Sequence, residues 1–570
     1  MNPIEAYASA ISVYPGDPLA FHVRTELGHF RFRIEIYRQG ETEVLMHQAT
    51  AIAQDYDTPI NAYEVGCDWS PAYQFTIPNA WKSGVYIARL ISSLGAITNV
   101  LFIVKSAHSD HSKILLQLAV NTYQAYNNWG GKSLYNYNSK DQVKSNKVSF
   151  DRPLDPEANF FVQWDVHFVR WIESNGFAVD YCTNVDLHDE PALLNDYSLF
   201  LSIGHDEYWS KEMRDRVEAF IAQGGNVAFF GANLCWWQAR LEQRNRTLVC
   251  YHDANQDPVS DRSRTTVRWR EQPVNRPEEQ MTGMSFAHGA FWSGENGDRP
   301  AVDYRVRFPQ HWVFDGTGLA YDDRFGADDN IIGYETDAAQ FREIQGIPMV
   351  TGANGTPRNL IVLAFAALKD WGRGLGQAGM ATMGIYRNKG TVFTAGTIEW
   401  ARGLQDPDSP VSQITQNVLT QLSRSDAQSL SLINSNFEQW ITPSQPTAWQ
   451  IDGDGQVLAD PTASRDGDLG LRVEATNLTW ISQEFVGEGH TLYQVEGWVK
   501  ADRPGATLRL QSTETWRDFA IARHSGSGNW ELIRAIGKVE DESPMFSARV
   551  KLQVDAGVTA MYEQVKIEIV

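Results

Sequence analysis

Short apolar runs alternate with helical segments between residues 114 and 231, and this alternation limits the fold more than any other feature of the chain. Ile114–Val120 is a continuous apolar run, which is typical of a strand buried on both faces. Similar runs follow at Phe177–Cys182, Leu199–Ile203 and Asn226–Gly231. Strands that alternate with helices in this way predict a mostly parallel, doubly wound α/β sheet.

Capping residues mark the helices between these runs. Asp155 can cap a helix whose first turn holds Pro156, and Ser210 can cap another that stops at Gly224. A last helix follows Pro410 and closes the α/β domain near residue 424. The polar, aromatic segment 121–135 is expected to be a loop.

The two ends of the chain have a different pattern, with short β-rich runs, frequent turns and almost no helical periodicity. We therefore predict a multidomain α/β plus all-β protein. An Ig-like β-sandwich is expected at 1–106, a doubly wound α/β domain of the class I amidotransferase-like type at 107–424, and a β jelly roll at 430–570.

Composition narrows the function classes. The 570 residues include 49 Lys and Arg against 70 Asp and Glu, a net charge of −21, which disfavours nucleic acid and anionic membrane as main partners. The first residues lack the basic and apolar regions of a signal peptide, and no apolar run reaches the length of a membrane span. We therefore expect a cytoplasmic protein.

Familiar catalytic motifs fail in this sequence. There is no G-x-S-x-G and no H-E-x-x-H. Gly131-Lys132-Ser133 lacks the earlier glycine of a phosphate-binding loop, because position 126 is Tyr126. Gly374–Gly379 fits a dinucleotide-binding string, but the residues after it favour a strand rather than a helix. Any hydrolysis must therefore activate water in another way.

Polar side chains gather at three predicted strand ends: Asn121–Tyr126, Gly204–Tyr208 and Gly231–Asn233. On a parallel sheet all three open onto one edge. Phenolate and carboxylate oxygens are hard donors that suit a hard cation such as ferric iron, and His205 could move protons beside it. The same residues are also consistent with acids that only favour a helix N-terminus, and with an aromatic loop that stacks sugars.

At these residues the chain resembles the large-subunit family of N,N-dimethylformamidase. The resemblance is carried by Asn121–Tyr135, Gly204–Trp209 and Gly231–Asn233, and by the N-terminal pattern Tyr14-Pro-Gly-Asp17 … Ile36-Tyr-Arg38 … Trp81–Tyr86. It spans roughly residues 8–424.

The resemblance implies hydrolysis of a formamide C–N bond by a mononuclear Fe(III) that two tyrosines and one carboxylate hold. It places the metal ligands at Tyr86, Tyr126 and Glu207, where the sandwich meets the α/β domain. It also implies catalytic roles for His205 and Asn233 and, by its best counterpart, for Glu335. Asp206 and Tyr208 are assigned structural roles.

Two departures from the family bear on partners. The family's large subunit has additional N-terminal sequence, and it works with a small partner subunit, so a small partner or further copies of this chain are expected beside the amide substrate. The C-terminal part instead resembles a carbohydrate-binding jelly roll, which implies a glycan ligand. Five tryptophans there could stack sugars: Trp440, Trp449, Trp480, Trp498 and Trp516.

Two alternatives to the formamide hydrolase remain. One is a glycan-binding protein whose α/β domain is catalytically silent. The other is an iron hydrolase that acts on a larger amide or an amide-bearing sugar.

Overall fold

A computed structural model describes residues 4–26, 30–107, 111–292, 298–344, 346–368, 371, 379–424, 432–465, 467–489, 491–539 and 545–569. The chain divides into two compact units, one made of Met1–Arg342 with Val350–Ser425 and the other of Glu343–Met349 with Asp426–Val570. Within the described ranges, no helix is both long and apolar enough to cross a membrane. Most of the Gly374–Gly379 string lies outside the described residues.

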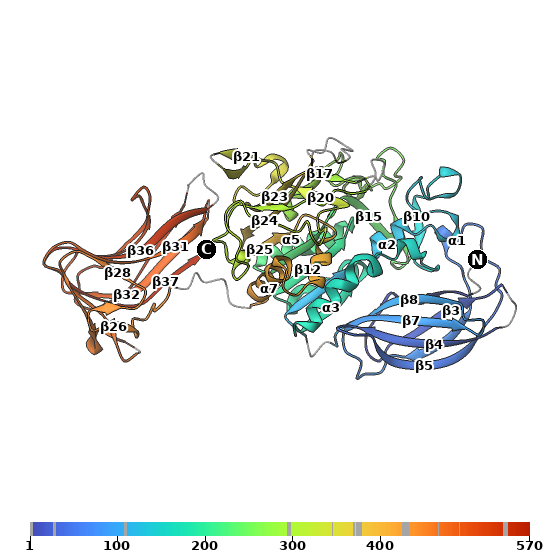
Figure 1. Ribbon diagram of the computed structural model, residues 1–570, viewed down its shortest axis with the longest axis horizontal. Helices are drawn as coiled ribbons and strands as arrows, with labels where there is room; N and C mark the ends of the chain where they lie inside the picture. The colour runs from blue at the N-terminus through green and yellow to red at the C-terminus, as the bar shows by residue number, and fades with distance from the viewer. Residues whose placement is uncertain are drawn as a thin grey trace. The chain divides into compact units, whose positions relative to one another are not determined.

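The N-terminal part is a β-sandwich, as predicted. A three-stranded sheet, β1-β3-β6, faces a five-stranded sheet, β2-β8-β7-β4-β5 (Figure 1). Their bounds are β1 Glu5–Ala8, β2 Ser12–Val13, β3 Pro18–Arg24, β4 Phe30–Gln39, β5 Val44–Ala53, β6 Pro71–Thr76, β7 Gly84–Ser92 and β8 Ile97–Val104, with the short helix α1 at Ala62–Val65. Alternate residues such as Phe21, Ile34 and Phe102 are fully buried in one shared core.

The α/β part is built on a nine-stranded sheet, β11-β9-β12-β14-β25-β24-β23-β18-β19. Its strands are β9 Ile114–Leu118, β11 Val179–Thr183, β12 Leu199–His205, β14 Asn226–Ala232, β18 Tyr304–Val306, β19 Arg324–Phe325, β23 Ile361–Ala367, β24 Met380–Asn388 and β25 Gly390–Thr394. The pairs from β11 to β25 are parallel, and the pairs from β25 to β19 are antiparallel. The predicted parallel order therefore holds for the half that carries the candidate site.

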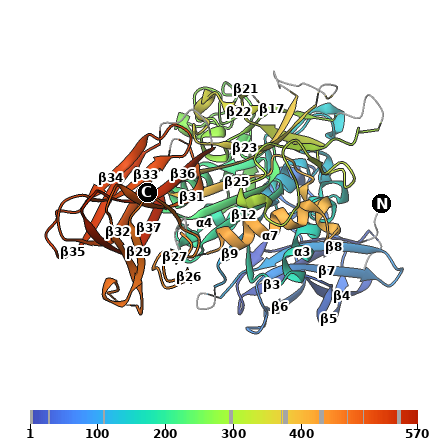
Figure 2. The same ribbon diagram turned by 60° about the vertical axis from the view of Figure 1, so that its left-hand side comes forward.

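Helices cover both faces of this sheet (Figures 1 and 2). On one face lies α5 (Lys211–Gln223), which shares a core with Phe229 of β14. On the other face lie α3 (Val166–Ser174) and α7 (Pro410–Leu422), where Phe230 of β14 packs on Phe168 of α3. Successive residues of a strand point to opposite faces, so the apolar run of β14 serves both layers.

The predicted caps of α5 are confirmed. Ser210 Oγ accepts a hydrogen bond from Met213 N at 3.3 Å, and Gly224 takes the left-handed conformation at φ 104°. Two segments differ from prediction. Part of the expected loop is the helix α2 (Val120–Tyr126). Asp155 caps only a separate 3-10 turn over Pro156–Ala158, and the longer helix begins after it as a π-helical turn over Phe161–Asp165.

Smaller elements surround the carboxyl ends of the parallel strands. A four-stranded sheet, β10-β16-β15-β13, and the pair β17-β20 lie there. The remaining bounds are β10 Lys147–Ser149, α4 Asn184–Asp189, β13 Tyr208–Ser210, β15 Trp237–Glu242, β16 Thr247–Val249, α6 Glu279–Thr282, β17 Ser285–Phe291, β20 Glu335–Ala338, β21 Phe341–Ile344 and β22 Ile347–Val350.

The C-terminal unit is a second β-sandwich, with the antiparallel sheets β28-β31-β36-β33-β34 and β29-β30-β37-β32-β35 around one core. Its strands are β26 Trp440–Thr442, β27 Gln445–Pro446, β28 Gln450–Asp452, β29 Gln456–Asp460, β30 Gly470–Glu474, β31 Thr479–Glu488, β32 Leu492–Ala501, β33 Ala506–Ser512, β34 Asp518–Arg523, β35 Trp530–Lys538, β36 Met545–Val554 and β37 Thr559–Ile569.

The five C-terminal tryptophans that could stack sugars divide into two groups. Trp449 belongs to the buried core and Trp440 packs against it, so these two rings are structural. Each of the others lies under a cation: Arg465 over Trp498 at 3.6 Å, Lys551 over Trp480 at 4.2 Å and Arg549 over Trp516 at 4.6 Å.

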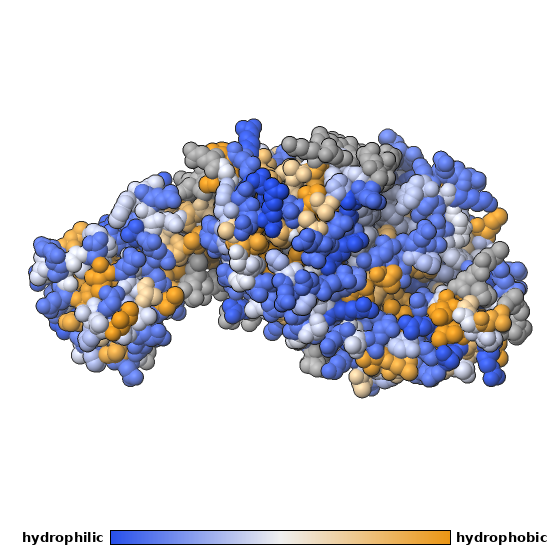
Figure 3. All heavy atoms as spheres, viewed as in Figure 1, coloured by the Kyte–Doolittle hydropathy of each residue, from blue (hydrophilic) through white to orange (hydrophobic). Residues whose placement is uncertain are grey.

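The surface visible in Figure 3 is mostly hydrophilic, and its apolar residues lie in small groups. This is expected when the apolar runs of the sequence fill the cores.

Candidate active site

Two tyrosine hydroxyls converge on the carboxylate of Glu207. Tyr126 Oη donates to Glu207 Oε2 at 3.0 Å. Tyr135 Oη lies 2.9 Å from both Oε1 and Oε2 of the same carboxylate. The two tyrosine rings pack together with their centroids 4.4 Å apart. Phenol and carboxylate oxygens thus gather at one point.

The turn between β12 and β13 positions Glu207. Its backbone N donates to Thr122 Oγ1 of α2 at 3.0 Å. The neighbouring Asp206 is buried and accepts hydrogen bonds from Gln117 Nε2, Ser202 Oγ and Asn184 Nδ2 at 2.7, 2.8 and 3.1 Å. Burial raises the pKa of Asp206 to about 6. These bonds pin the turn to three neighbouring segments, so Asp206 has the structural role expected of it.

His205, the last residue of β12, lies beside this cluster. Its Nε2 is 3.0 Å from Glu335 Oε2 and 3.5 Å from Glu207 Oε2, and its side chain is fully buried. Burial alone lowers the pKa of His205, but the charges of Glu335 and Glu207 outweigh it, so the pKa is raised. The imidazole is therefore placed to hold and release a proton between two carboxylates.

Asn233 completes the group from the end of β14. Its Nδ2 lies 3.1 Å from Glu335 Oε2 and 3.2 Å from His205 Nε2. Asn233 has a left-handed backbone at φ 51°, and the buried carboxylate of Asp337 accepts hydrogen bonds from Asn233 N at 2.8 Å and Leu234 N at 3.2 Å. Asp337 and Glu335 are alternate residues of β20, so one strand holds both the loop of Asn233 and its side chain.

Burial dominates the electrostatics of the cluster and favours the protonated forms of its acidic groups. Burial raises the pKa of Glu207, although His205 works against it. Burial, followed by the charge of Glu207, raises the pKa of Tyr126 and of Tyr135 well above 10. His205 is thus the base beside several buried acidic oxygens. A positive ion among these oxygens would stabilise their charged forms.

Aromatic rings enclose His205 and separate it from bulk water. The centroids of Tyr126, Phe160, Trp164 and Tyr334 lie 5.6 to 6.3 Å from that of the imidazole. Tyr126, Phe160 and Tyr334 also line a cavity of about 140 Å³, which has room for several water molecules. Its remaining lining includes the exposed Tyr137, so the cavity leads from the surface to the cluster.

In the part of the chain that the structure describes, no group of three or more His, Cys, Asp and Glu side chains is arranged to hold a metal ion. Tyrosine is not among these four residue types. A metal at Glu207 would therefore need the phenol oxygens as ligands.

A comparison with models of protein families places the chain in one of them. Residues 32–415 match the model described as N,N-dimethylformamidase beta subunit-like, C-terminal. The match covers more than half of the 570 residues. The chain belongs to this family.

Two curated relatives share the family. The N,N-dimethylformamidase beta subunit of Alcaligenes sp is 24% identical over 438 residues, which covers 63% of this chain and 55% of that protein. The corresponding subunit of Paracoccus aminophilus is 22% identical over 442 residues, with the same shares. This chain therefore spans about half the length of the curated relatives that it matches.

Two solved structures that resemble this chain each cover about a quarter of it. TmCBM61 in complex with beta-1,4-galactotriose is 14% identical with a TM-score of 0.19, and covers 24% of this chain and 97% of that one. A CBM4 structure is 13% identical with a TM-score of 0.20, and covers 25% and 100%.

The structure brings together five of the six site residues that the sequence and the family resemblance predicted, and it does not bring Tyr86 to them. Tyr86 lies in the core of the N-terminal sandwich, where its ring stacks on Trp81 with centroids 4.8 Å apart. Its hydroxyl donates to the carbonyl of Lys82 at 2.9 Å. The cause is the strand period: at position 86 the side chain of β7 points into the sandwich.

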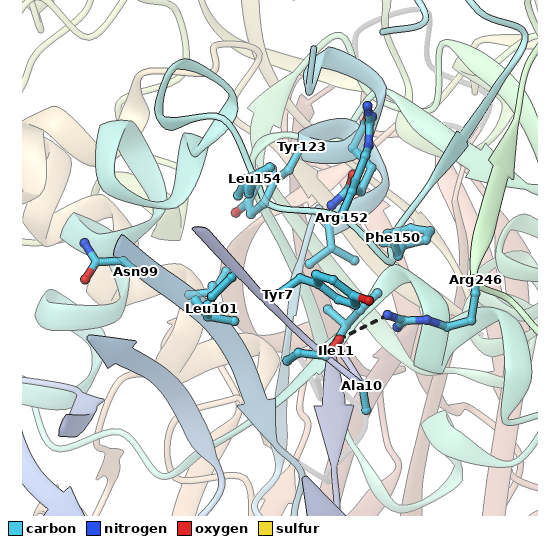
Figure 4. A pocket seen from close by; sticks show the side chains of 15 residues that line it. Tyr7, Ala10, Ile11, Asn99, Leu101, Tyr123, Phe150, Arg152, Leu154 and Arg246 are labelled. Atoms are coloured by element: carbon cyan, nitrogen blue, oxygen red, sulfur yellow. Dashed lines mark hydrogen bonds between the residues drawn. The ribbon is translucent and has the colours of Figure 1, made fainter. Parts of the chain in front are cut away.

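The contact between the sandwich and the α/β part holds a separate, small cavity of about 60 Å³ (Figure 4). Tyr7 and Leu101 line it from the sandwich, and Tyr123 and Arg246 from the α/β part. Arg246 Nη2 donates to the carbonyl of Ala8 at 3.2 Å. Neither Tyr86 nor Glu207 lines this cavity, so the cluster around Glu207 lies at the sheet edge rather than at this contact.

Three contributors to the site could not be predicted from the sequence. Tyr135 ends the aromatic segment 121–135, but nothing in that segment ranks it above its neighbours. Tyr334 directly precedes Glu335. His252, whose Nε2 lies 2.9 Å from the hydroxyl of Tyr208, stands in a long polar region without any motif, and no local signal could have found it.

Proposed function

We propose that this protein is an iron-dependent amide hydrolase that cleaves the C–N bond of a formamide or a related small amide. The observation that carries the proposal is the convergence of Tyr126, Tyr135 and Glu207 beside the His205–Glu335 pair. Membership in the dimethylformamidase-like family supports the reaction class. The activity of the longer relatives comes to this chain only as part of this proposal.

The residues present fit a hard, trivalent cation. Both phenol oxygens lie within 3.0 Å of the buried Glu207 carboxylate, and phenolate with carboxylate is a donor set that suits Fe(III). We assign the ligands to Tyr126, Glu207 and Tyr135, with Tyr135 in place of Tyr86. When bound, the iron would supply Lewis acidity toward a carbonyl oxygen and would lower the pKa of a water molecule.

Hydrolysis adds water across the amide: a C–O bond forms, the C–N bond breaks, and one water proton ends on the leaving nitrogen. His205 Nε2 is the group placed to carry that proton, because it is buried among the carboxylates. Glu335 holds the imidazole, and Asn233 Nδ2 is a donor for an oxygen that gains charge. The ring of Tyr126 forms part of the wall against bulk water.

The dimensions of the cavity favour a small substrate. A volume of about 140 Å³ with walls of Tyr126, Phe160 and Tyr334 suits a compact, largely apolar amide such as a dialkylformamide. A bulky amide or an amide-bearing sugar would have to displace these rings.

Iron analysis and formate release test the proposal together. The purified protein is expected to contain about one iron per chain, to show a visible phenolate-to-iron band, and to release formate from N,N-dimethylformamide. Glu207→Gln should lose all three properties. Tyr37→Phe is the matched control, because Tyr37 donates to Glu35 on the N-terminal sandwich, far along the chain from the cluster. A protein that stays colourless and iron-free after iron loading contradicts the proposal.

We propose a second function for the C-terminal unit, the binding of a glycan. Trp516 is 54% exposed although its backbone is held at φ 59°, a conformation unusual for a bulky residue. Arg549 and Lys551 are alternate residues of β36, so the cations over Trp516 and Trp480 share one sheet face. Arg549 and Lys551 are themselves buried, so they hold the rings in place, and rings fixed on one face suit sugar stacking.

A glycan array with the full chain tests the second function. Trp516→Ala should weaken binding of any glycan that the wild type retains. Ile536→Ala is the control, because Ile536 is equally exposed at 54% but belongs to the other sheet. Binding that is lost in both variants, or in neither, argues against this face as the site.

A further inference from the structure

A chain of hydrogen bonds runs outward from Tyr135, away from Glu207. Tyr208 Oη donates to Tyr135 Oη at 2.7 Å. His252 Nε2 lies 2.9 Å from Tyr208 Oη, and His252 Nδ1 lies 2.7 Å from Lys144 Nζ. Lys144 Nζ also donates to the carbonyl of Tyr251 at 2.8 Å. Tyr208 is fully buried, whereas Lys144 is partly exposed, so the chain links the cluster to the protein surface.

Elementary chemistry fixes the direction of this chain. A lysine ammonium has donors and no acceptor, so His252 Nδ1 must accept from Lys144. The imidazole then carries its proton on Nε2, which donates to Tyr208 Oη. The hydroxyl of Tyr208, having accepted, turns its own proton toward Tyr135. Desolvation, with Lys144 and Arg268 nearby, lowers the pKa of His252 well below 6.5, which fits a neutral ring.

Packing holds the links in place. The ring of His252 stands edge-on to that of Trp237, with centroids 4.2 Å apart and planes at 72°. Tyr208 belongs to β13, whose pairing partner β15 carries Trp237. The histidine and the tyrosine that it contacts are thus fixed by one sheet.

We infer that Tyr208, His252 and Lys144 are positioning residues for Tyr135: they direct a hydrogen-bond donor onto the Tyr135 oxygen and so set its orientation and the electron density that it offers. The inference rests on the proposed function only where it concerns iron. A donor on a ligand oxygen stabilises the charged phenolate, so that less free energy is spent on deprotonation when a metal binds, and it also lowers the energy of the electrons that the oxygen offers to the metal. The chain ends on Tyr135 and not on Tyr126, so the two ligands are unequal.

Nitrogen-15 NMR of the histidines in the iron-free protein tests the direction without any metal. His252, assigned by its loss in His252→Gln, should be neutral and protonated on Nε2. Lys144→Met removes the donor to Nδ1 and should abolish this preference. An Nδ1-protonated ring in the wild type overturns the directed chain.

Visible spectra and iron titrations of the loaded protein test the effect on Tyr135. Tyr208→Phe keeps the ring and removes the donor, so the phenolate-to-iron band should move to longer wavelength and iron affinity should fall about 10- to 100-fold. His252→Gln, which keeps an N–H donor, should shift the band less than His252→Leu. Tyr37→Phe should leave both properties unchanged.

The two possible failures are distinguishable. A wild type that binds no iron overturns the effect on the metal together with the proposed function. A wild type that binds iron, with Tyr208→Phe unchanged in band and affinity, overturns the positioning role alone.

Discussion

Tyr135 Oη lies 2.9 Å from both carboxylate oxygens of Glu207, although 72 residues separate them in the chain. A single phenol oxygen therefore contacts both oxygens of the carboxylate that was expected to bind the metal. Tyr126 reaches only Oε2, at 3.0 Å. This asymmetry makes Tyr135, rather than Tyr86, the partner of Tyr126 in the proposed metal site.

The two tyrosines can be separated by matched substitutions. Tyr135→Phe should remove most bound iron and the visible band, because it deletes an oxygen at the carboxylate. Tyr86→Phe should keep iron and activity and lose about 1 kcal/mol of unfolding free energy, the value of its hydrogen bond to Lys82. Iron analysis with denaturant unfolding checks both. The opposite pattern would restore Tyr86 as the ligand.

Asp165 should give the folded protein a pH-dependent stability. Its carboxyl is fully buried, accepts from Tyr123 Oη, and has its pKa raised by burial from 3.8 to about 7. Above pH 4 the unfolded chain releases this proton while the folded chain keeps it, so the stability from this group falls as the pH rises toward 7 and is then constant. Asp165→Asn should remove this fall of a few kcal/mol in the unfolding free energy between about pH 4 and pH 7. Unfolding of wild type and variant at pH 4 to 8 measures the difference, and parallel curves would contradict it.

The N-terminal sandwich should depend on one bidentate ion pair for its attachment to α3. Arg38 Nη1 and Nη2 lie 2.7 and 2.9 Å from the two oxygens of Glu173, and both side chains are mostly buried. Arg38→Met should lower the unfolding free energy by about 1–3 kcal/mol. The control is Arg89→Met, whose pair with Glu43 is more exposed and is expected to contribute less than about 1 kcal/mol. Equal losses in thermal or urea unfolding would show that the pair does not tether the sandwich.

Asp337 should act on catalysis through Asn233. Asp337→Ala leaves the backbone N–H groups of Asn233 and Leu234 without their acceptor, so stability should fall by about 2 kcal/mol. Because Asn233 then loses its fixed position, kcat should fall while KM changes little. Asp337→Asn keeps one acceptor and should recover part of both. Steady-state kinetics beside unfolding measurements provide the check, and a stable, fully active Asp337→Ala enzyme would sink the idea.

Much of the secondary structure of this protein could be predicted from local sequence patterns. The strands of both sandwiches follow from their β-rich runs and turns, and α5 follows from Ser210 and Gly224 as caps. The side chains of Glu207, His205 and Asn233 could be placed at one edge of the sheet, because the carboxyl ends of parallel strands meet there. The helix α2 was missed, since its polar and aromatic residues have weak helical signals and tertiary contacts decide its conformation.

The sequence by itself therefore determined the elements, their caps and the strand ends that carry the chemistry. Only the tertiary structure decided which other distant groups join them: Tyr135 over Tyr86, Asp337 from β20, and His252 behind Tyr208. The physical reason is that local patterns report the face on which a side chain lies, whereas a contact across many residues depends on how separate segments pack. Position 86 illustrates this, because the strand period turns its phenol into the sandwich core and leaves Glu207 to a tyrosine from another segment.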